Sequence, residues 1–467
     1  MRFAPTIPIL AMAGSLMSSG RDVTAAEFRL PPTSHRTLEN GIRLHVMEFR
    51  TLPLVNFHVV VGAGSSVDPE GRAGLADLVA DLLRKGTTSR TATQIAEETD
   101  TLGALLDTGT DLDASHISSE FLAADAATGL ALLHDLIAHP AFSTEEIERL
   151  RGEKLGELQA IREDPSALAG RRFMQILYGA HPYGHPVSGW ESTISAITRE
   201  DITGFFARYY VPSNIIVVAA GDFDAKEMME SLSRTFDTLP AAGKAAGPAS
   251  DAAPVAQAAR GIHLIDKPES TQSQVRIGAI GIDRKDPDYI PLMVANTIFG
   301  GGFTSRLMEE IRVNRGLSYG VRSRFVATLM DGPYVISTFT KNDTTLEIIQ
   351  VALAELERFR RDGATAEELE RAKSYLKGTF AIGHQSADAM ADMMADIAFY
   401  ALPRDYYDGY LDRLMSVTRE DVARVARRFP FDGLQIMVLG EAKAIRAPLA
   451  TLGTVQDAPL DTDTPRR

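Results

Sequence analysis

An internal duplication constrains the fold of this chain more than any other feature of its sequence. The tetrapeptide Thr-Arg-Glu-Asp occurs at residues 198–201 and again 220 residues later at 418–421, each time at the start of an amphipathic stretch. A second matching pair, residues 143–149 and 365–371, is separated by 222 residues. In each copy a Thr or Ser precedes a carboxylate by three residues, which is the pattern of a helix N-cap. Because both pairs share nearly the same offset, we predict two related halves of about 220 residues.

Each half combines strand-like and helical segments. An apolar, β-branched run that ends in glycine follows each Thr-Arg-Glu-Asp helix, at residues 215–219 and 434–439, and such runs are typical of buried strands. Further strands are predicted at 55–61 and 274–280, and helices at 73–83 and 144–161. We therefore predict an α+β fold with two homologous domains of about 220 residues, each a mostly antiparallel sheet packed with helices.

Changes in amino-acid composition along the chain indicate the boundaries of these domains. Residues 239–261 are rich in Ala, Gly and Pro, which is typical of a linker, and the tail at 447–467 is similar. The two domains are therefore predicted at 27–238 and 262–446. An apolar run after the first two residues, followed by small residues, predicts a secretory signal peptide over 1–26 and a periplasmic protein. The alternative is a short buried or disordered arm in a cytoplasmic protein.

Composition also excludes several kinds of site and partner. The chain has no cysteine, so disulfides and thiolate metal sites are excluded. Its formal net charge of -14 argues against a nucleic-acid partner, because phosphates call for a basic surface. After the N-terminal region no segment approaches the roughly 18 consecutive apolar residues of a membrane-spanning helix, so no membrane association is predicted.

One segment of the first half has the outline of a metal site without its ligands. Residues 74–87 read Gly-Leu-Ala-Asp-Leu-Val-Ala-Asp-Leu-Leu-Arg-Lys-Gly-Thr. This resembles the zinc segment of the pitrilysin and insulinase peptidases, the inverzincins, in which G-L-A-H-x-x-E-H precedes K-G-T. In that family the two histidines bind zinc and the glutamate acts as a base. Asp77, Ala80 and Asp81 stand at these three positions, and Glu157 stands where the family has its third ligand.

The loss of both imidazoles predicts that this chain holds no metal and no cofactor of its own. Two alternatives remain for the carboxylates of Asp77, Asp81 and Glu157: an oxygen site for calcium or magnesium, or side chains that are merely solvated or paired. The pair His181 and His185 has ligand-like spacing, but the prolines between and after them predict a turn instead of a helix.

The second half retains the family's other signature. Residues 300–319 contain a glycine-rich turn, a helical stretch and Arg-x-x-x-Gly-Leu-x-Tyr. By this resemblance, Arg312 and Tyr319 are the catalytic and substrate-binding residues, reaching across a cleft to peptide carbonyls. A phenol or a guanidinium can stabilise the negative charge that develops on an attacked carbonyl oxygen. The alternative is that Arg312 only pairs with Glu309 or Glu310 and Tyr319 only packs.

A broken zinc half joined to an intact Arg/Tyr half resembles the non-catalytic subunits of heterodimeric peptidases in this family, in which two similar chains close like a clam. The resemblance implies a chain that is inactive alone and that completes the zinc site of a homologous partner acting on peptides. The partner is expected to carry the zinc and the intact His-x-x-Glu-His. The alternative is a purely structural or assembly protein of the same fold.

Overall fold

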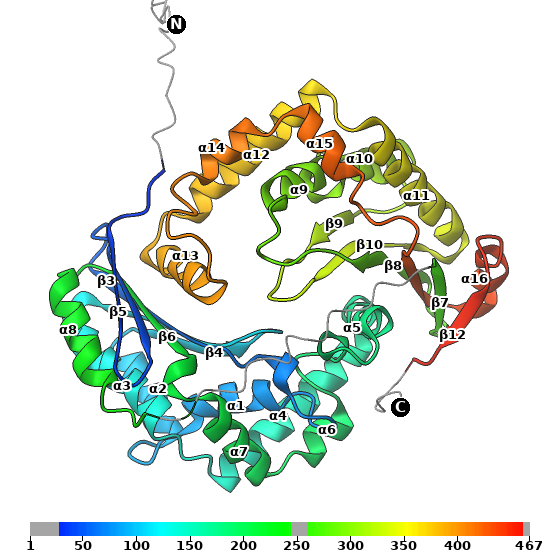
Figure 1. The fold of residues 1–467 in the computed structure, drawn as a ribbon. Coiled ribbons are helices and arrows are strands. Elements are labelled where there is room, and N and C mark those ends of the chain that lie inside the picture. The colour runs from blue at the N-terminus through cyan, green and yellow to red at the C-terminus, as the bar shows by residue number, and fades with distance from the viewer. Residues whose placement is uncertain (1–27, 242, 244–258, 461–467) are drawn as a thin grey trace, which may run out of the picture.

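The computed structural model describes residues 28–241, 243 and 259–460. The signal peptide predicted at 1–26 and most of the linker predicted at 239–261 lie outside these described residues. The chain forms two halves, each built on a six-stranded mixed sheet packed with helices (Figure 1). The predicted α+β fold is therefore confirmed.

The sheet of the first half has the strand order β1-β2-β6-β3-β5-β4. Its strands are β1 (Thr33–Thr37), β2 (Arg43–Glu48), β3 (Leu54–Val61), β4 (Leu105–Thr110), β5 (Ser115–Leu122) and β6 (Ile215–Gly221). Only β2 and β6 pair in parallel, and every other neighbour is antiparallel. The core strands β3 and β6 are buried almost throughout, which explains their continuous apolar sequences.

The sheet of the second half has the strand order β12-β7-β11-β8-β10-β9. Its strands are β7 (Gly261–Asp266), β8 (Gln272–Ile280), β9 (Val321–Phe325), β10 (Pro333–Lys341), β11 (Gln435–Gly440) and β12 (Val455–Ala458). Five of these strands repeat the order and directions of β2-β6-β3-β5-β4, so the duplication seen in the sequence is a duplication of topology.

The edge strands β1 and β12 break this symmetry and correct one prediction. In the first half β1 precedes β2 and pairs with it antiparallel, whereas β12 returns from the end of the chain and pairs with β7 in parallel. The prediction that residues 447–467 form an unpacked tail is therefore wrong for the described residues of this segment. Helix α16 (Ala442–Leu449) and β12 occupy it, because an edge strand needs only backbone hydrogen bonds to its neighbour and few large apolar side chains.

Helices cover both sheets. The first half contains α1 (Leu75–Leu82), α2 (Ala92–Thr101), α3 (Ala126–Ala138), α4 (Thr144–Glu163), α5 (Pro165–Tyr178), α6 (Glu191–Ala196), α7 (Arg199–Tyr209) and α8 (Ala225–Phe236). The second contains α9 (Tyr289–Asn296), α10 (Arg306–Met308), α11 (Thr345–Asp362), α12 (Ala366–Gly383), α13 (Ala387–Phe399), α14 (Tyr410–Ser416), α15 (Arg419–Ala426) and α16. Capping boxes open α7 and α15 at Thr198 and Thr418, as predicted from the repeat.

The two halves exchange one helix each. Helix α5 of the first half packs on β8 and β11 of the second, and α13 of the second half packs on β3 and β6 of the first (Figure 1). Met390, Met393 and Met394 of α13 are buried in this contact. Phe173 of α5 is buried in the reciprocal one. Since each sheet needs the other half's helix to cover one face, the halves form a single interlocked body.

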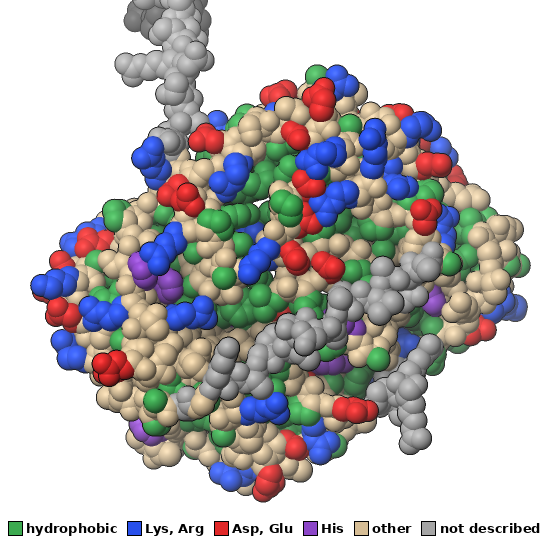
Figure 2. Space-filling view, in the orientation of Figure 1, with side chains coloured by type: hydrophobic (Ala, Val, Ile, Leu, Met, Phe, Trp, Pro, Cys, Tyr) green, Lys and Arg blue, Asp and Glu red, His purple; other side chains and the backbone are tan. Residues whose placement is uncertain are grey.

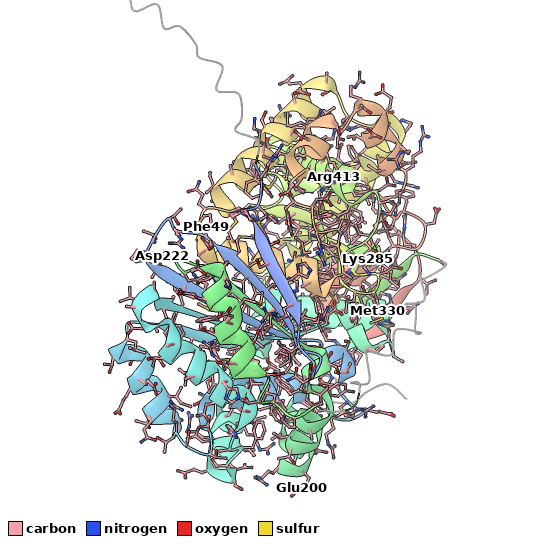
Figure 3. All side chains as sticks on the ribbon, turned by 60° about the vertical axis from the view of Figure 1, so that its left-hand side comes forward. Phe49, Glu200, Asp222, Lys285, Met330 and Arg413 are labelled. Atoms are coloured by element: carbon pink, nitrogen blue, oxygen red, sulfur yellow. The ribbon has the colours of Figure 1, made fainter. Side chains whose placement is uncertain are left out.

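The outer surface is mixed in charge. Lysine and arginine side chains are interspersed with aspartate and glutamate over the face shown in Figure 2. In Figure 3 the half that bears Glu200 and Asp222 lies below the half that bears Lys285 and Arg413, and Met330 lies at their junction. There the Met330 N–H donates to the Tyr183 hydroxyl across the two halves at 3.2 Å. Within the described ranges, no helix combines the length and apolar character that crossing a membrane requires.

Candidate functional site

The degenerate zinc segment lies on α1, where it faces α4. Asp77 and Asp81 are one helical turn apart, so their carboxylates project from the same face of α1. The Lys154 ammonium of α4 lies between them, with Nζ 2.7 Å from Asp77 Oδ2 and 2.7 Å from Asp81 Oδ2. Asp81 also accepts a hydrogen bond from the Thr108 hydroxyl at 3.1 Å. A lysine of this chain thus forms an ion pair with each of the two aspartates.

This cluster is buried and its charges depend on one another. Asp77 and Lys154 are each only 8% exposed. Burial would lower the pKa of Lys154, but attraction and hydrogen bonds from Asp77 and Asp81 outweigh it and raise that pKa. Burial raises the pKa of Asp77, and the ammonium of Lys154 opposes that rise. The ammonium therefore stays charged, as a buried ion pair of this kind requires.

The arrangement does not fit zinc. Ala80 offers no base, neither aspartate position offers an imidazole, and a fixed cation stands between the two carboxylates. Glu157, at the third ligand position, is 64% exposed at its side chain and lies 3.9 Å from Lys154 Nζ. Among the described residues, no group of three or more His, Cys, Asp or Glu is placed to hold a metal ion. In this arrangement Asp77 and Asp81 are each paired with Lys154, and Glu157 stays largely exposed.

The second candidate site is an open cavity on the second half. Its volume is about 510 Å³, and it lies over β8, β9 and β10 beside the start of α5. Arg312 and Tyr319 both line it, with the Arg312 guanidinium carbon 4.3 Å from the centre of the Tyr319 ring. The same guanidinium lies 5.1 Å from the Phe303 ring. Tyr319 is 76% exposed, which a packing role does not explain.

The alternative ion pairs for Arg312 are not formed. Glu310 accepts from Arg315 Nε at 2.7 Å and from the Asn314 amide at 2.9 Å. No hydrogen bond or ion pair joins Arg312 to Glu309 or to any other described residue. The two predicted residues therefore meet at one cavity, with the guanidinium held only by aromatic faces and available to a ligand.

Two π-helical turns shape the wall of this cavity. They span Thr297–Gly301 and Glu309–Asn314, and the second places Arg312. Such turns are rare and occur often at functional sites. A Cβ at Gly300 would clash with the Ser323 hydroxyl of β9, so glycine there allows the turn to lie directly against the sheet.

The similarity of this chain to known proteins covers both sites. Residues 48–190 match the family described as Insulinase (Peptidase family M16), and residues 196–376 match the Peptidase M16 inactive domain. The chain belongs to peptidase family M16. The first match contains Asp77, Asp81 and Lys154, and the second contains Arg312 and Tyr319. The predicted family is therefore confirmed.

Solved structures and curated relatives resemble this chain over most of its length. A crystal structure of a peptidase M16 inactive domain from Pseudomonas fluorescens has a TM-score of 0.83 and 28% identity, covering 88% of this chain and 99% of that one. A protease from Helicobacter pylori shares the fold, with a TM-score of 0.79 at 20% identity over 88% of this chain and all of that one. An uncharacterized zinc protease of Mycobacterium tuberculosis is 29% identical over 396 residues, 84% of this chain and 89% of that protein.

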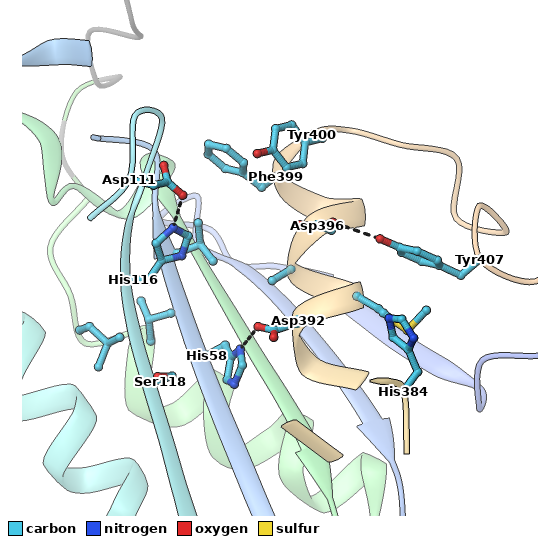
Figure 4. Close-up of a pocket in the computed structure, with 15 residues that line it drawn as sticks. His58, Asp111, His116, Ser118, His384, Asp392, Asp396, Phe399, Tyr400 and Tyr407 are labelled. Atoms are coloured by element: carbon cyan, nitrogen blue, oxygen red, sulfur yellow. Dashed lines mark hydrogen bonds and ion pairs between the residues drawn. The ribbon is translucent and has the colours of Figure 1, made fainter. Parts of the chain in front are cut away.

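The M16 chain also has a polar cavity between its halves that the sequence did not reveal. It measures about 420 Å³ and lies between β3, β5 and α13 (Figure 4). His58 of β3 is buried there, with Nε2 2.8 Å from Asp388 Oδ1 and Nδ1 3.0 Å from Asp392 Oδ1. Burial would lower the pKa of His58, but the two carboxylates outweigh it and raise the pKa to about 9. The imidazolium therefore joins the halves electrostatically.

Two residues of these sites were missed by sequence reasoning for the same reason. Lys154 reads as one charge among many on a polar helix, and His58 reads as one polar residue in an apolar strand. Their partners lie far away along the chain, so only the packing of α4 on α1, and of α13 on β3, reveals their roles. The predicted turn at His181 and His185 is confirmed by the short 3-10 helix between them (Pro182–Gly184).

Proposed function

We propose that this M16 chain is the non-catalytic, substrate-binding subunit of a heterodimeric zinc metallopeptidase. In this proposal a homologous partner holds the zinc, and Arg312 and Tyr319 of this chain act on the peptide in trans. The observation that supports it most is the contrast between the two sites. The zinc position of this chain is filled by its own Lys154, whereas the half-buried Arg312 and the exposed Tyr319 line an open cavity.

The roles follow from the chemistry of the side chains. Zinc in the partner would supply the Lewis acid for peptide hydrolysis. The Tyr319 hydroxyl would donate a hydrogen bond to the oxygen that gains negative charge as the peptide carbonyl is attacked. The Arg312 guanidinium, oriented by the rings of Phe303 and Tyr319, would donate to neighbouring peptide carbonyls and so hold the substrate in register. This chain by itself would have no peptidase activity.

The test is the turnover of the mixed complex with the zinc-bearing partner. Addition of this chain is expected to raise the partner's peptidase activity above its own baseline. Tyr319→Phe removes one hydroxyl and is expected to lower turnover about 10²- to 10³-fold, the usual effect of deleting one oxyanion donor. Tyr375→Phe is the matched control, because Tyr375 lines the same cavity and is 47% exposed, yet has no assigned role.

The outcomes separate this proposal from its alternative. Near-normal turnover with Phe at position 319, in a complex shown to be a heterodimer, would contradict the catalytic role of Tyr319. If the partner's peptidase activity is unchanged in such a complex, the result would favour the alternative, a purely structural or assembly role for this chain. Location in the periplasm stays a prediction from residues 1–26, and secretion of a fusion to those residues would check it.

A further inference from the structure

The cavity that contains Arg312 and Tyr319 has an unusual charge. Three arginines line it, Arg276, Arg312 and Arg322, and none of the described residues that line it is an aspartate or glutamate. The chain as a whole is acidic, with 62 Asp and Glu against 48 Lys and Arg. A positive cavity in an acidic protein focuses its field on anionic ligands, because opposite charge is favoured inside a low-dielectric cleft.

Two of these arginines form a row across the sheet. Ser337 of β10 lies opposite Arg276 of β8 on one side and opposite Arg322 of β9 on the other. Directly opposite residues point to the same face of a sheet, so both guanidiniums project into the cavity. Their Cα atoms are separated by two strand spacings, about 10 Å. A small anion that enters between them can therefore reach both side chains.

Of these two arginines, Arg276 gives the stronger indication that the cavity binds a ligand. It is only 6% exposed, yet among the described residues its guanidinium donates only to neutral groups: the Ser166 carbonyl at 2.9 Å, the Ser166 hydroxyl at 3.0 Å, and backbone carbonyls of its own sheet. Asp164, the acid that acts on it electrostatically, caps α5 by accepting from the Ser166 N–H at 2.7 Å. Burial, followed by repulsion from Arg324, lowers the pKa of Arg276 to about 10. Buried arginines are usually paired with an anion.

Arg322 completes the site from the rim. It is exposed and, within the described part of the chain, makes no ion pair or hydrogen bond through its side chain. Phe303, Tyr319 and Tyr375 give the same cavity aromatic walls. A volume of about 510 Å³ suits a group of a few non-hydrogen atoms and an adjoining side chain.

We propose that this cavity binds a peptide carboxylate, held between Arg276 and Arg322, and so selects peptides with an anionic group near the segment that Arg312 and Tyr319 address. This inference rests on the proposed function in taking peptides as ligands. The carboxylate has two possible sources, the C-terminus of the peptide or an Asp or Glu side chain. The fork of Arg322 can match a carboxylate bidentately, which gives both affinity and orientation. Arg276, whose terminal nitrogens already donate to Ser166 and to backbone carbonyls, contributes mainly its positive charge.

Isothermal titration calorimetry with the full chain tests the proposal without the partner or turnover. Three unlabelled octapeptides of Ala, Gly and Phe serve as probes: one with a free C-terminus, its C-terminal amide, and the amide with one internal Glu. The free acid, the Glu peptide or both are expected to bind at least about tenfold more tightly than the neutral amide, as loss of a charge-assisted contact predicts. The peptide that binds more tightly identifies the source of the carboxylate.

Arg322→Gln is expected to abolish this preference, and Arg324→Gln is its matched control. Arg324 lies on the same strand and the same face, carries the same charge, and does not line the cavity. Arg276→Gln is expected to act like Arg322→Gln, with its folding checked by circular dichroism because the side chain is buried.

Equal affinity for all three peptides, no measurable binding of any of them, or equal effects of Arg322→Gln and Arg324→Gln would overturn the carboxylate site. These outcomes are distinct from failure of the proposed function. Loss of the catalytic role of Tyr319 would appear only in the turnover of the mixed complex, whereas the peptide preference is measured on this chain alone.

Discussion

The two halves share a topology but differ in whether the charged side chains at their candidate sites have partners within the chain. In the first half Lys154 occupies the space between Asp77 and Asp81, so that the charges are satisfied from within the chain. In the second half Arg276, Arg312 and Arg322 converge on an open cavity without a carboxylate among its described lining residues. The same fold therefore closes one site and leaves the other open. Removal of one member of a buried ion pair destabilises the fold, whereas charges without a counter-charge point to a ligand.

Removal of Lys154 is expected to have the largest effect on stability. Lys154→Met would leave Asp77 and Asp81 facing each other without a counter-charge, and should lower the free energy of unfolding by about 3–5 kcal/mol. Urea denaturation followed by circular dichroism measures this. Lys373→Met is the comparison in the second half. Lys373 is also buried, but it donates to the Met415 carbonyl, and its ion-pair partner Glu370, 3.6 Å away, is 66% exposed, so the loss of Lys373 should cost only about 1 kcal/mol. Equal losses of unfolding free energy in the two variants would show that Lys154 contributes no more to stability than Lys373 does.

Rebuilding the zinc site tests whether Lys154 replaces the metal. The variant Asp77→His, Ala80→Glu, Asp81→His restores the family's residues, but the ammonium of Lys154 would still stand at the ligands. Adding Lys154→Leu should tighten zinc binding by about 10²-fold, the scale of effects from residues around a metal site. Zinc per chain after competition with a chelator checks this. Equal zinc affinity with and without Lys154 would contradict the idea.

The contact between the halves is expected to weaken as the solution becomes alkaline. The pKa of His58 in the folded chain is about 9, above its ordinary value of 6.5. Its stabilisation is therefore complete below pH 6.5 and is lost as the pH rises through 9. Because Asp388 and Asp392 are more than half exposed, solvent screening reduces the effect to about 2 kcal/mol.

The measurement is the free energy of unfolding between pH 6.5 and 9.5, for the unmodified chain and for His58→Gln. The His58→Gln variant should lose the pH-dependent part of the free energy of unfolding. His45→Gln is the control, because burial lowers the pKa of His45 to about 4 and its titration falls outside this pH window. If His58→Gln keeps the full pH dependence, the imidazolium does not join the halves.

The smallest expected effect sharpens the role of the open site. Arg312→Ala should weaken peptide binding about tenfold, because a guanidinium that donates to peptide carbonyls contributes to ground-state binding. Arg315→Ala, three residues away, should leave binding unchanged, since Arg315 already pairs with Glu310 and Glu347. Calorimetry with the preferred octapeptide compares the two variants. Equal affinities would place Arg312 outside the peptide site.

The sequence alone determined the large features of this protein. The repeat at 198–201 and 418–421 predicted the duplication, and the apolar runs predicted β3, β6, β8 and β11, because helix caps and buried strands leave local signals. The resemblance of residues 74–87 to the family's zinc segment predicted a lost zinc site, and the resemblance of residues 300–319 to its second signature implied that Arg312 and Tyr319 share a cleft. These features depend on residues that lie close together along the chain or on patterns typical of the family.

The tertiary structure decided which groups those residues meet. Lys154 reaches Asp77 across 77 positions, and the row from Arg276 through Ser337 to Arg322 needs the register of three strands. The exchange of α5 and α13 between the halves, and the addition of β12 to the second sheet, likewise depend on distant packing. A single sequence carries no signal for such pairings, because it does not show whether a given lysine is buried or solvated. Burial and charge balance, which separate the closed site from the open one, exist only once the chain is folded.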